Sequence, residues 1–416
     1  MSNSSLESSA ENKPTGRASS RRTKRWIAVA AAVVVVAGGA TAIAVSQGGD
    51  SQRSGTVISG STSAAASMKI AVGGSTSCLV YYSNIECWGG NSQGQAGNNT
   101  LTSPAAIGKV KTSSSAIFGG NSVSAGLAHG CGFYGVNAVF CWGSNDNGQV
   151  GSGDSYTPEY SFANQVTKST GGLLMNLLAV SAGDDGTCAV TAAKEVWCWG
   201  GGDNVARLYS AAGNPVTALS YGGVGNVCMV TAPSGQTPYV FCSGGNPSGI
   251  PEPRAISVGG DHSCVVLAVD GAVKCWGDNT YGQLGNGTTT ASQGSLQSTG
   301  ITNAIDVVTG LKHTCALIAG STAAANTVKC WGDYSAAQTG QAPGGTSKQT
   351  TPIEVAGLLG ATAISTSSGS SHTCASGGGG GAGAPWVKCW GLNTSAQVSS
   401  PASPFITTPV KITPVA

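Results

Sequence analysis

The chain has 416 residues, of which 64 are glycine and 9% are charged, and its formal net charge is +2. From residue 61 onward it carries 13 basic and 15 acidic residues, so this part has a net charge of −2. That balance excludes the clustered basic surface that nucleic-acid binding requires, and we expect no nucleic-acid partner. A Gly-rich, charge-poor chain without long apolar stripes of helical period is typical of an all-β protein with many short strands.

The first 67 residues differ from the rest of the chain. Residues 1–25 are polar and end in a basic cluster that includes Arg21, Arg22 and Arg25. Residues 26–45 are uncharged and apolar, which is long enough to cross a bilayer as a helix. The basic flank predicts that the N-terminus stays in the cytoplasm.

Two interpretations of residues 26–45 stay open. An uncleaved signal anchor would hold the protein at the cell membrane as a single-pass protein, with its body outside. A signal peptide cut after Ala42 or Ala44 would release a secreted body. Residues 46–67, rich in Ser, Gly and Ala, are expected to form a flexible linker. Both interpretations export residues 68–416.

An internal repeat in seven copies fills the exported part. The 14 cysteines form seven consecutive pairs with closely spaced members. The pairs are Cys78 with Cys87, Cys131 with Cys141, Cys188 with Cys198, Cys228 with Cys242, Cys264 with Cys275, Cys315 with Cys330, and Cys374 with Cys389. The pairs recur about every 50 residues, and a repeat of this length indicates one supersecondary unit per copy.

The residues that flank the cysteines confirm the register of the copies. A glycine stands five residues before every first cysteine, and another stands two residues after every second cysteine. Tryptophan follows the second cysteine in six copies, and Ser243 replaces it in the fourth. Glutamine recurs eight residues after the second cysteine in five copies: Gln95, Gln149, Gln283, Gln338 and Gln397.

Each copy predicts four short strands. In residues 259–287, the turn signal Asp270-Gly271 separates two strand-like runs that carry Cys264 and Cys275. A strand such as 255–258 comes before them, and a Pro-containing segment such as 351–353 follows in each copy. Four short strands in about 40–55 residues are typical of a propeller blade. We therefore predict an all-β, seven-bladed β-propeller over residues 68–416, and the last strand, within 407–415, completes either the first or the seventh blade.

The cysteine pairs are predicted to form disulfides. Directly opposed residues on adjacent antiparallel strands have Cα atoms roughly 4.5–5.5 Å apart, which is within disulfide range. An exported body also lies in an oxidising compartment. We expect one disulfide in each copy, between the members of the pairs given above.

The pattern G-x-x-H-[ST]-C, followed by C-W-G-x-N-x-x-G-Q-L-G, resembles the RCC1 repeat. Residues 259–287 match almost completely and 141–151 nearly so, whereas the third copy lacks the G-Q-L-G loop and the fourth lacks the tryptophan. The resemblance covers residues 68–416 and implies a seven-bladed propeller. The founding member of the family is a nuclear exchange factor for a small GTPase that binds chromatin. A secreted bacterial branch includes a β-lactamase inhibitor and shares the extracellular setting predicted here.

No catalytic, metal or cofactor site stands out in the sequence. Residues 145–148, Asn-Asp-Asn-Gly, lack the spaced carboxylates of a calcium loop and are interpreted as a turn. Asp184-Asp185 is a paired carboxylate without a catalytic partner. Four histidines each stand two residues before the first cysteine of their copy, and we interpret them as structural residues that bond a neighbouring strand: His129, His262, His313 and His372. We therefore predict no catalytic residue, no metal and no cofactor.

The loops after each C-W-G are predicted to project to one side of the ring. They are rich in Asn, Ser, Thr and Gly with single tyrosines, a composition typical of adaptable contact surfaces. Ordinary solvated loops are the competing interpretation. The candidate partner-binding residues are Asn145, Asn147, Tyr156, Asn279, Tyr281, Tyr334 and Asn393.

We therefore expect an exported, non-enzymatic, monomeric propeller that binds a protein or a cell-envelope polymer through one face of the ring. One alternative is an RCC1-type guanine-nucleotide exchange factor, which requires a cytosolic body. Another is a secreted enzyme inhibitor. A third is an enzyme, a hydrolase or lyase, which predicts carboxylates or histidines that converge near the axis of the ring.

Overall fold

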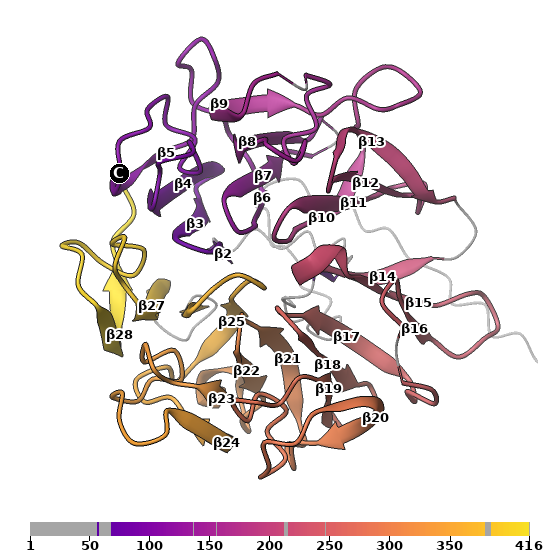
Figure 1. The fold of residues 1–416 in the computed structure, drawn as a ribbon, viewed down its shortest axis with the longest axis vertical. Helices are drawn as coiled ribbons and strands as arrows, with labels where there is room; N and C mark the ends of the chain where they lie inside the picture. The colour runs from indigo at the N-terminus through magenta and orange to yellow at the C-terminus, as the bar shows by residue number, and fades with distance from the viewer. Residues whose placement is uncertain are drawn as a thin grey trace, which may run out of the picture. The chain divides into compact units, whose positions relative to one another are not determined.

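The computed structural model describes residues 56–57, 68–135, 137–154, 156–211, 215–245, 247–378 and 384–415. Within these residues the chain forms seven four-stranded sheets, arranged as blades around a central axis (Figure 1). The described part contains no α-helix, only the short 3₁₀ helices Gly223–Gly225 and Ala323–Ala325. The predicted all-β, seven-bladed propeller is confirmed.

Six blades take all four strands from one sequence repeat, and the strands follow one another from the axis to the rim. Blade 1 contains β2 (Lys69–Val72), β3 (Thr76–Tyr81), β4 (Asn84–Gly89) and β5 (Ala105–Lys109). Blade 2 contains β6 (Ser122–Ala125), β7 (His129–Phe133), β8 (Phe140–Ser144) and β9 (Glu159–Gln165). Blade 3 contains β10 (Leu177–Ala182), β11 (Gly186–Thr191), β12 (Val196–Gly200) and β13 (Asp203–Ser210).

The second half of the ring repeats this order. Blade 5 contains β17 (Pro253–Val258), β18 (His262–Leu267), β19 (Val273–Gly277) and β20 (Ser292–Ser298). Blade 6 contains β21 (Ala304–Thr309), β22 (His313–Ile318), β23 (Thr327–Asp333) and β24 (Lys348–Glu354). Blade 7 contains β25 (Ala361–Ser365), β26 (His372–Gly377), β27 (Trp386–Leu392) and β28 (Phe405–Ile412). The C-terminal strand β28 therefore completes the seventh blade, not the first.

Blade 4 is built differently. Its repeat supplies only three strands, which are β14 (Val216–Tyr221), β15 (Val227–Thr231) and β16 (Tyr239–Cys242). The fourth strand of this sheet is β1 (Thr56–Val57), which pairs with the inner edge of β14. The prediction of four strands in every copy is wrong here, because only the short segment 243–252 connects β16 with β17. In blade 5 the equivalent connection, 278–303, is long enough to contain the fourth strand β20.

Most of the N-terminal region lies outside the described residues. This holds for the expected basic segment 1–25, the expected membrane span 26–45 and the expected linker 46–67, apart from the two residues of β1. Within the described chain, no helix has the length and apolar character needed to cross a bilayer.

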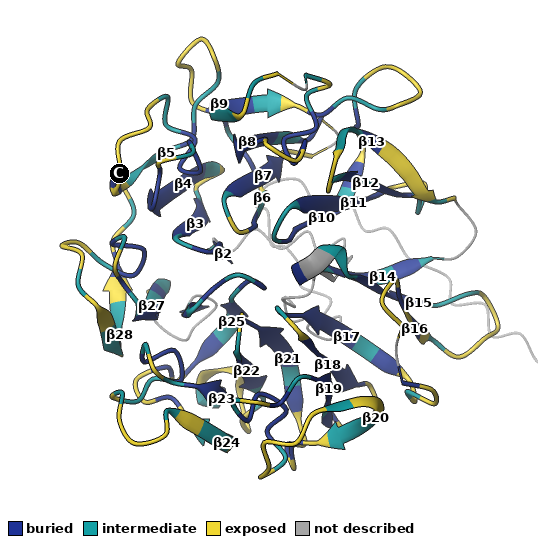
Figure 2. Cartoon of the chain, viewed as in Figure 1, coloured by how far each residue is buried: buried dark blue, intermediate teal, exposed yellow. Residues whose placement is uncertain are grey.

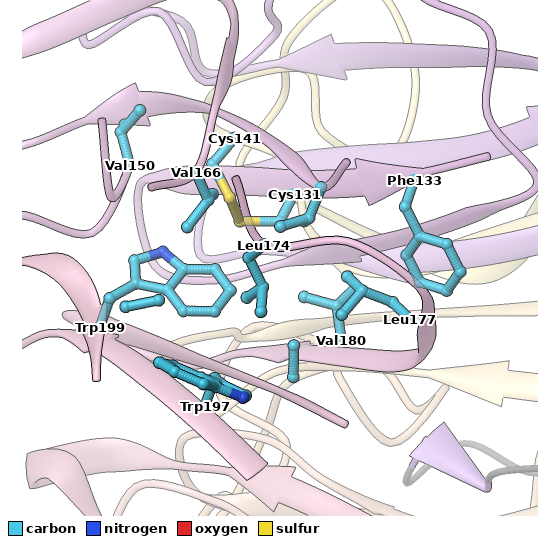
Figure 3. Close-up of a cluster of buried hydrophobic side chains, with 13 residues drawn as sticks. Cys131, Phe133, Cys141, Val150, Val166, Leu174, Leu177, Val180, Trp197 and Trp199 are labelled. Carbon is cyan, nitrogen blue, oxygen red and sulfur yellow. A yellow bond between two sulfur atoms is a disulfide. The ribbon is translucent and has the colours of Figure 1, made fainter. Parts of the chain in front are cut away.

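The hydrophobic core lies between the blades. Each of the seven junctions buries its own cluster, formed by facing residues of two adjacent sheets. At the junction of blades 2 and 3, Trp199 and Leu174 pack beside the Cys131–Cys141 disulfide (Figure 3). The inner strands are buried and the rim strands β13, β24 and β28 are partly exposed (Figure 2). A blade cannot bury both of its faces alone, so the ring forms as a whole.

All seven expected disulfides are present and leave no free cysteine among the described residues. They join Cys78 with Cys87, Cys131 with Cys141, Cys188 with Cys198, Cys228 with Cys242, Cys264 with Cys275, Cys315 with Cys330, and Cys374 with Cys389. Each disulfide joins the second and third strands of its sequence repeat, with 4.1 Å between the two Cα atoms.

The Cα distance differs slightly from the expected one. At 4.1 Å it is shorter than the distance of roughly 4.5–5.5 Å that is usual for directly opposed residues on antiparallel strands. Opposed residues without mutual backbone hydrogen bonds approach most closely, and the cysteines occupy positions of this kind. The predicted pairing itself is confirmed in every blade.

Serine and histidine side chains join neighbouring blades. A serine opposite the first cysteine accepts a hydrogen bond from a backbone N–H of the next blade, as Ser257 Oγ does from Thr309 N at 3.0 Å. The buried histidine bonds a hydroxyl of the next blade, as in the 2.8 Å contact between His313 Nε2 and Thr373 Oγ1. The same serine bond is made by Ser124, Ser181, Ser220 and Ser365, and the same histidine bond by His129, His262 and His372. The structural interpretation of the four histidines is supported.

The repeated tryptophan and glutamine form a third link between blades. The Nε1–H of Trp331 donates to the backbone oxygen of Gln283 in the preceding blade, at 2.8 Å. Trp88, Trp142, Trp199 and Trp390 make the same bond to Gln397, Gln95, Gln149 and Gln338. Blade 7 joins blade 1 through these contacts, and the backbone N–H of Val415 adds a 2.9 Å bond to Glu86.

Candidate binding face

The loop after each C-W-G is held by two buried side chains. In blade 5, Asn279 accepts a bond from the backbone N–H of Leu284 at 2.9 Å and donates to the oxygens of Thr288 and Thr290, both at 3.0 Å. Gln283 Oε1 accepts from the N–H of Tyr281 at 2.8 Å. The equivalent asparagines make the same bond to the chain five residues on: Asn91, Asn145 and Asn393.

This geometry changes the role of three candidate contact residues. Asn145, Asn279 and Asn393 were expected to present a contact surface, but they are at most 5% exposed. Their amides satisfy the backbone of the loop, which would otherwise be buried without partners. They therefore shape the loops and do not lie on the surface.

The other four candidates lie nearer the solvent. Asn147 is exposed, Tyr156 is 93% exposed, and Tyr281 and Tyr334 are half-buried. Tyr334 takes the place that Asn279 has in blade 5, so the loop of blade 6 carries an aromatic ring at that position. The structure does not gather the four into one continuous site, since they come from blades 2, 5 and 6.

Tyr281 has a distinct environment at the junction of blades 5 and 6. The Nζ atom of Lys312, from the loop before β22, lies 4.4 Å from the centre of the Tyr281 ring and 3.3 Å from its hydroxyl. The Nζ atom of Lys348, at the start of β24, lies 5.6 Å from the same ring. We call these three residues the Tyr281 patch. Two ammonium groups against one ring make a positive, aromatic surface suited to carboxylate-bearing partners.

Carboxylates also gather beside the central channel. Asp184 Oδ1 accepts a 2.6 Å bond from Ser368 Oγ, which joins blade 3 to blade 7 across the ring. Burial raises the pKa of Asp184, and the neighbouring Asp185 and Asp261 raise it further, while the Ser368 bond lowers it. Burial, with the charges of Asp185 and Asp184, raises the pKa of Tyr221 to about 12. The adjoining channel has a volume of 210 Å³ and is lined mainly by serine and threonine hydroxyls and small apolar side chains.

The carboxylate cluster does not assemble a recognisable catalytic set. All four histidines are used between blades, and burial lowers their pKa to about 4 for His129 and His262 and about 3 for His313 and His372. No group of three His, Cys, Asp or Glu within the described residues is placed to hold a metal ion.

An apolar pocket lies near the rim of blades 1 and 2. It has a volume of 590 Å³ and is lined by Phe118, Tyr134, Phe140, Leu173 and Met175 among others. Nothing in the repeat pattern indicated this pocket, because most of its residues lie in the variable connections between strands. The grouping of aromatic residues around 118–140 was the one available signal.

The repeat also matches known proteins. The family described as Regulator of chromosome condensation (RCC1) repeat matches residues 178–204, 254–283 and 270–317. The chain carries RCC1 repeats and forms an RCC1-like seven-bladed propeller. The E3 ubiquitin-protein ligase HERC2 of Homo sapiens is 28% identical over an alignment of 199 residues, which covers 41% of this chain and 4% of HERC2. The chain thus spans a small fraction of that relative.

Solved structures share the RCC1-like fold. Prp20p from Saccharomyces cerevisiae, described with its binding to Gsp1p and histones, superposes with a TM-score of 0.58 at 16% identity. That match covers 83% of this chain and 86% of Prp20p. Yeast RCC1 (Prp20) bound to Kap60 gives a TM-score of 0.59 at 15% identity, over 92% of this chain and 91% of that one. At these identities the likeness shows the fold alone.

The residues that recur among the copies belong to the RCC1 repeat, and their role is to stabilise the propeller. The cysteines, the histidines, the glutamines and five of the six recurring tryptophans form disulfides or hydrogen bonds within or between blades, and the sixth, Trp276, is buried in the core. A specific binding site must therefore use residues that differ from copy to copy, such as the three of the Tyr281 patch.

Proposed function

We propose that this protein is an exported, non-enzymatic propeller that binds a partner protein with an acidic surface through the loop face of its ring. The Tyr281 patch is the observation that carries the proposal. It combines two cations with an aromatic ring, and the ring lies on a loop that the buried Asn279 and Gln283 side chains hold in place. A preorganised loop loses little conformational entropy on binding.

The proposal of export rests on the disulfides and on the N-terminal sequence. Seven disulfides in one domain suit an oxidising compartment and are rare in the cytosol. Residues 26–45 supply the hydrophobic segment that directs a chain to the membrane. A secreted enzyme inhibitor would be one form of the same function.

Site-specific photo-crosslinking tests the binding face. A photoreactive residue is placed at Tyr281 of the full chain. The control carries it at Tyr82, which is 72% exposed in the turn between β3 and β4, at the opposite end of the blade from the C-W-G loops. We expect a discrete adduct from position 281 on intact producing cells, and its loss by about tenfold in a Lys312→Ala, Lys348→Ala background, because each charge pair contributes modestly. Equal adducts from both positions, or none from position 281, would contradict the proposed face.

Protease shaving of intact cells tests export separately. We expect the body to be released, and N-terminal sequencing of the fragment to begin within or after residues 46–67. A body that is cleaved only after the cells are opened would rule out export. In that case the exchange-factor role that the RCC1 resemblance implies becomes the better candidate.

A further inference from the structure

Among the described residues, no strand pairs with the outer edge of blade 4, and this sets it apart from the rest of the ring. In the six other blades a fourth strand pairs with the third: β5, β9, β13, β20, β24 and β28. In blade 4 the third strand, β16, pairs with β15 on one side, and no strand of the described chain pairs with its other side. The short connection to β17 leaves no chain in this repeat to fill the place.

The backbone of β16 is oriented to accept another strand. Cys228 and Cys242 oppose each other with Cα atoms 4.1 Å apart, the spacing of a pair without mutual backbone bonds. The N–H of Ser243 bonds the oxygen of Val227, which fixes the alternation along β16. By that alternation the N–H and C=O of Val240 point away from β15, toward the open edge.

The side chains of β16 make this edge apolar. Tyr239 is 41% exposed and Phe241 is 46% exposed, although each belongs to a residue class that folded proteins usually cover. Both lie on the side of blade 4 that faces blade 3, because Phe241 opposes Met229, which packs with blade 3. On the rim of blade 3, Tyr209 of β13 is also 41% exposed.

Blade 4 also lacks the charges that normally protect an open edge. Natural sheets discourage edge pairing with charged side chains, especially lysine. From residue 208 to residue 251 the chain contains no Asp, Glu, Lys or Arg, and this stretch includes all of β14, β15 and β16. A neutral edge with one apolar side is complementary to a neutral strand. A charged strand would bind less favourably, because its charges would lose water without gaining an opposite charge.

We propose that the outer edge of β16 is a second binding site, which accepts an extended, uncharged segment of a partner protein as the outer strand that the repeat of blade 4 does not supply. The six other blades define the geometry: a segment of 5 to 8 residues that runs antiparallel to the third strand. Its backbone pairs with Val240, and alternate side chains contact Tyr239 and Phe241. Since β16 has only four residues, these side-chain contacts provide much of the affinity.

Selection from a random peptide library displayed on phage tests the site, with the full disulfide-bonded chain as the target. The comparison target carries Tyr239→Lys and Phe241→Lys, which place charges on exposed positions and are expected to leave the fold intact. A matched control, Tyr156→Lys, adds a charge at the 93% exposed Tyr156, away from the edge. Thermal unfolding of all three proteins verifies that they are folded.

We expect the wild-type chain to enrich peptides with an uncharged, strand-forming core, and their affinity to fall at least tenfold on the double lysine variant but not on Tyr156→Lys. N-methylation of the peptide amide that pairs with Val240 should abolish binding, whereas N-methylation of the next residue should not, because alternate amides face away from the edge.

Three outcomes would overturn the proposal. They are no enrichment on the wild type over the double variant, enriched peptides that bind both targets equally, and an enriched set dominated by charged peptides. Sedimentation of the wild type alone adds a fourth: self-association abolished by Phe241→Lys would identify a second copy as the occupant instead. These readouts do not involve Tyr281, so they are independent of the proposed loop face.

Discussion

At the scale of single residues, glycine is required at its two recurring positions for different physical reasons. A Cβ on Gly259 would lie 2.5 Å from the backbone oxygen of Gly310, so this glycine permits the close approach of successive blades. Gly277 has φ +110°, and a Cβ there would lie 2.5 Å from the oxygen of Asp261. Six copies share this positive φ, and Gly244 in the fourth copy does not.

That difference gives a matched pair of variants. Gly277→Ala should lower the free energy of unfolding by about 2–4 kcal/mol, because it adds both backbone strain and a steric clash. Gly244→Ala should cost less than about 1 kcal/mol, since its nearest neighbour is the Asn226 side chain at 3.1 Å, which can move. Urea denaturation of the two variants measures both values. Equal losses would show that the strain at Gly277 is not the cause.

The four histidines predict a dependence of stability on pH. Burial depresses their pKa to about 3 or 4 in the folded protein, below the usual value of 6.5. The unfolded chain therefore binds more protons between these values, so stability is full above about pH 6.5 and falls as the pH drops toward 4. A difference of this size corresponds to roughly 3–5 kcal/mol for each histidine.

Urea denaturation at pH 7.5 and pH 5 measures this effect. We expect the free energy of unfolding to drop by several kcal/mol in the wild type and by less in His262→Gln, which removes one titrating group.

The contacts of Thr314 identify the tautomer of the neutral His262 ring. The Thr314 hydroxyl donates to Gln283 O at 2.9 Å, so it accepts from His262 Nε2–H. An identical pH dependence in both proteins would disprove the role assigned to His262.

At the scale of the elements, blade 4 is the weak sector of the ring. Its two junctions keep the serine bonds, from Ser181 to Tyr221 and from Ser220 to Val258. Among the described contacts they lack the histidine bond, because Gly186 and Asn226 occupy its position. They also lack the tryptophan bond, because Ser243 replaces the tryptophan at one junction and the fourth copy has no glutamine loop to receive Trp276 at the other. The departures that the sequence shows in copies three and four thus fall together at one place in the ring.

Hydrogen exchange followed by mass spectrometry should detect this sector. We expect backbone amides of β15 to exchange at least tenfold faster than those of β18, equivalent to a difference of about 1.4 kcal/mol in opening free energy. The fewer bonds between blades and the missing outer strand both lower the cost of local opening. Equal protection of β15 and β18 would mean that apolar packing alone sets the stability of the blades.

At the scale of the whole molecule, closure of the ring depends on contacts between the first and last copies of the repeat. His372 bonds Ser77 at 2.8 Å, and the N–H of Val415 bonds Glu86, which is completely buried. The disulfides act differently, because each closes a short loop within one blade. They stabilise the blades, while the contacts between blades stabilise the ring.

Removal of one disulfide tests this division. The variant Cys374→Ala, Cys389→Ala should lower the free energy of unfolding by about 3 kcal/mol, the chain-entropy value for a loop of about 15 residues. Reductant added to the native wild type below its melting temperature should leave this disulfide intact, as thiol trapping and mass spectrometry would measure, since both cysteines are at most 1% exposed. A variant as stable as the wild type would show that this disulfide does not constrain the unfolded chain.

The sequence alone was sufficient for the number of blades, the cysteine pairing and the structural use of the histidines. Each of these depends on spacing inside one copy, and local spacing fixes which residues oppose each other on adjacent strands. The sequence could not show which blade the C-terminal strand completes. The pattern of that strand fits the outer edge of the first blade as well as that of the seventh. The missing tryptophan marked the fourth copy as unusual, but it did not indicate which edge of blade 4 would lack a partner strand among the described residues.

Only the tertiary structure decided which loop residues are buried and which surfaces remain. Asn279 and Tyr281 are close neighbours in one polar loop, yet one holds the loop together and the other joins a cationic patch. The partners of Tyr281, Lys312 and Lys348, belong to the next copy of the repeat. Contacts of this kind form when two blades pack, so they depend on distances that no periodicity within one repeat records.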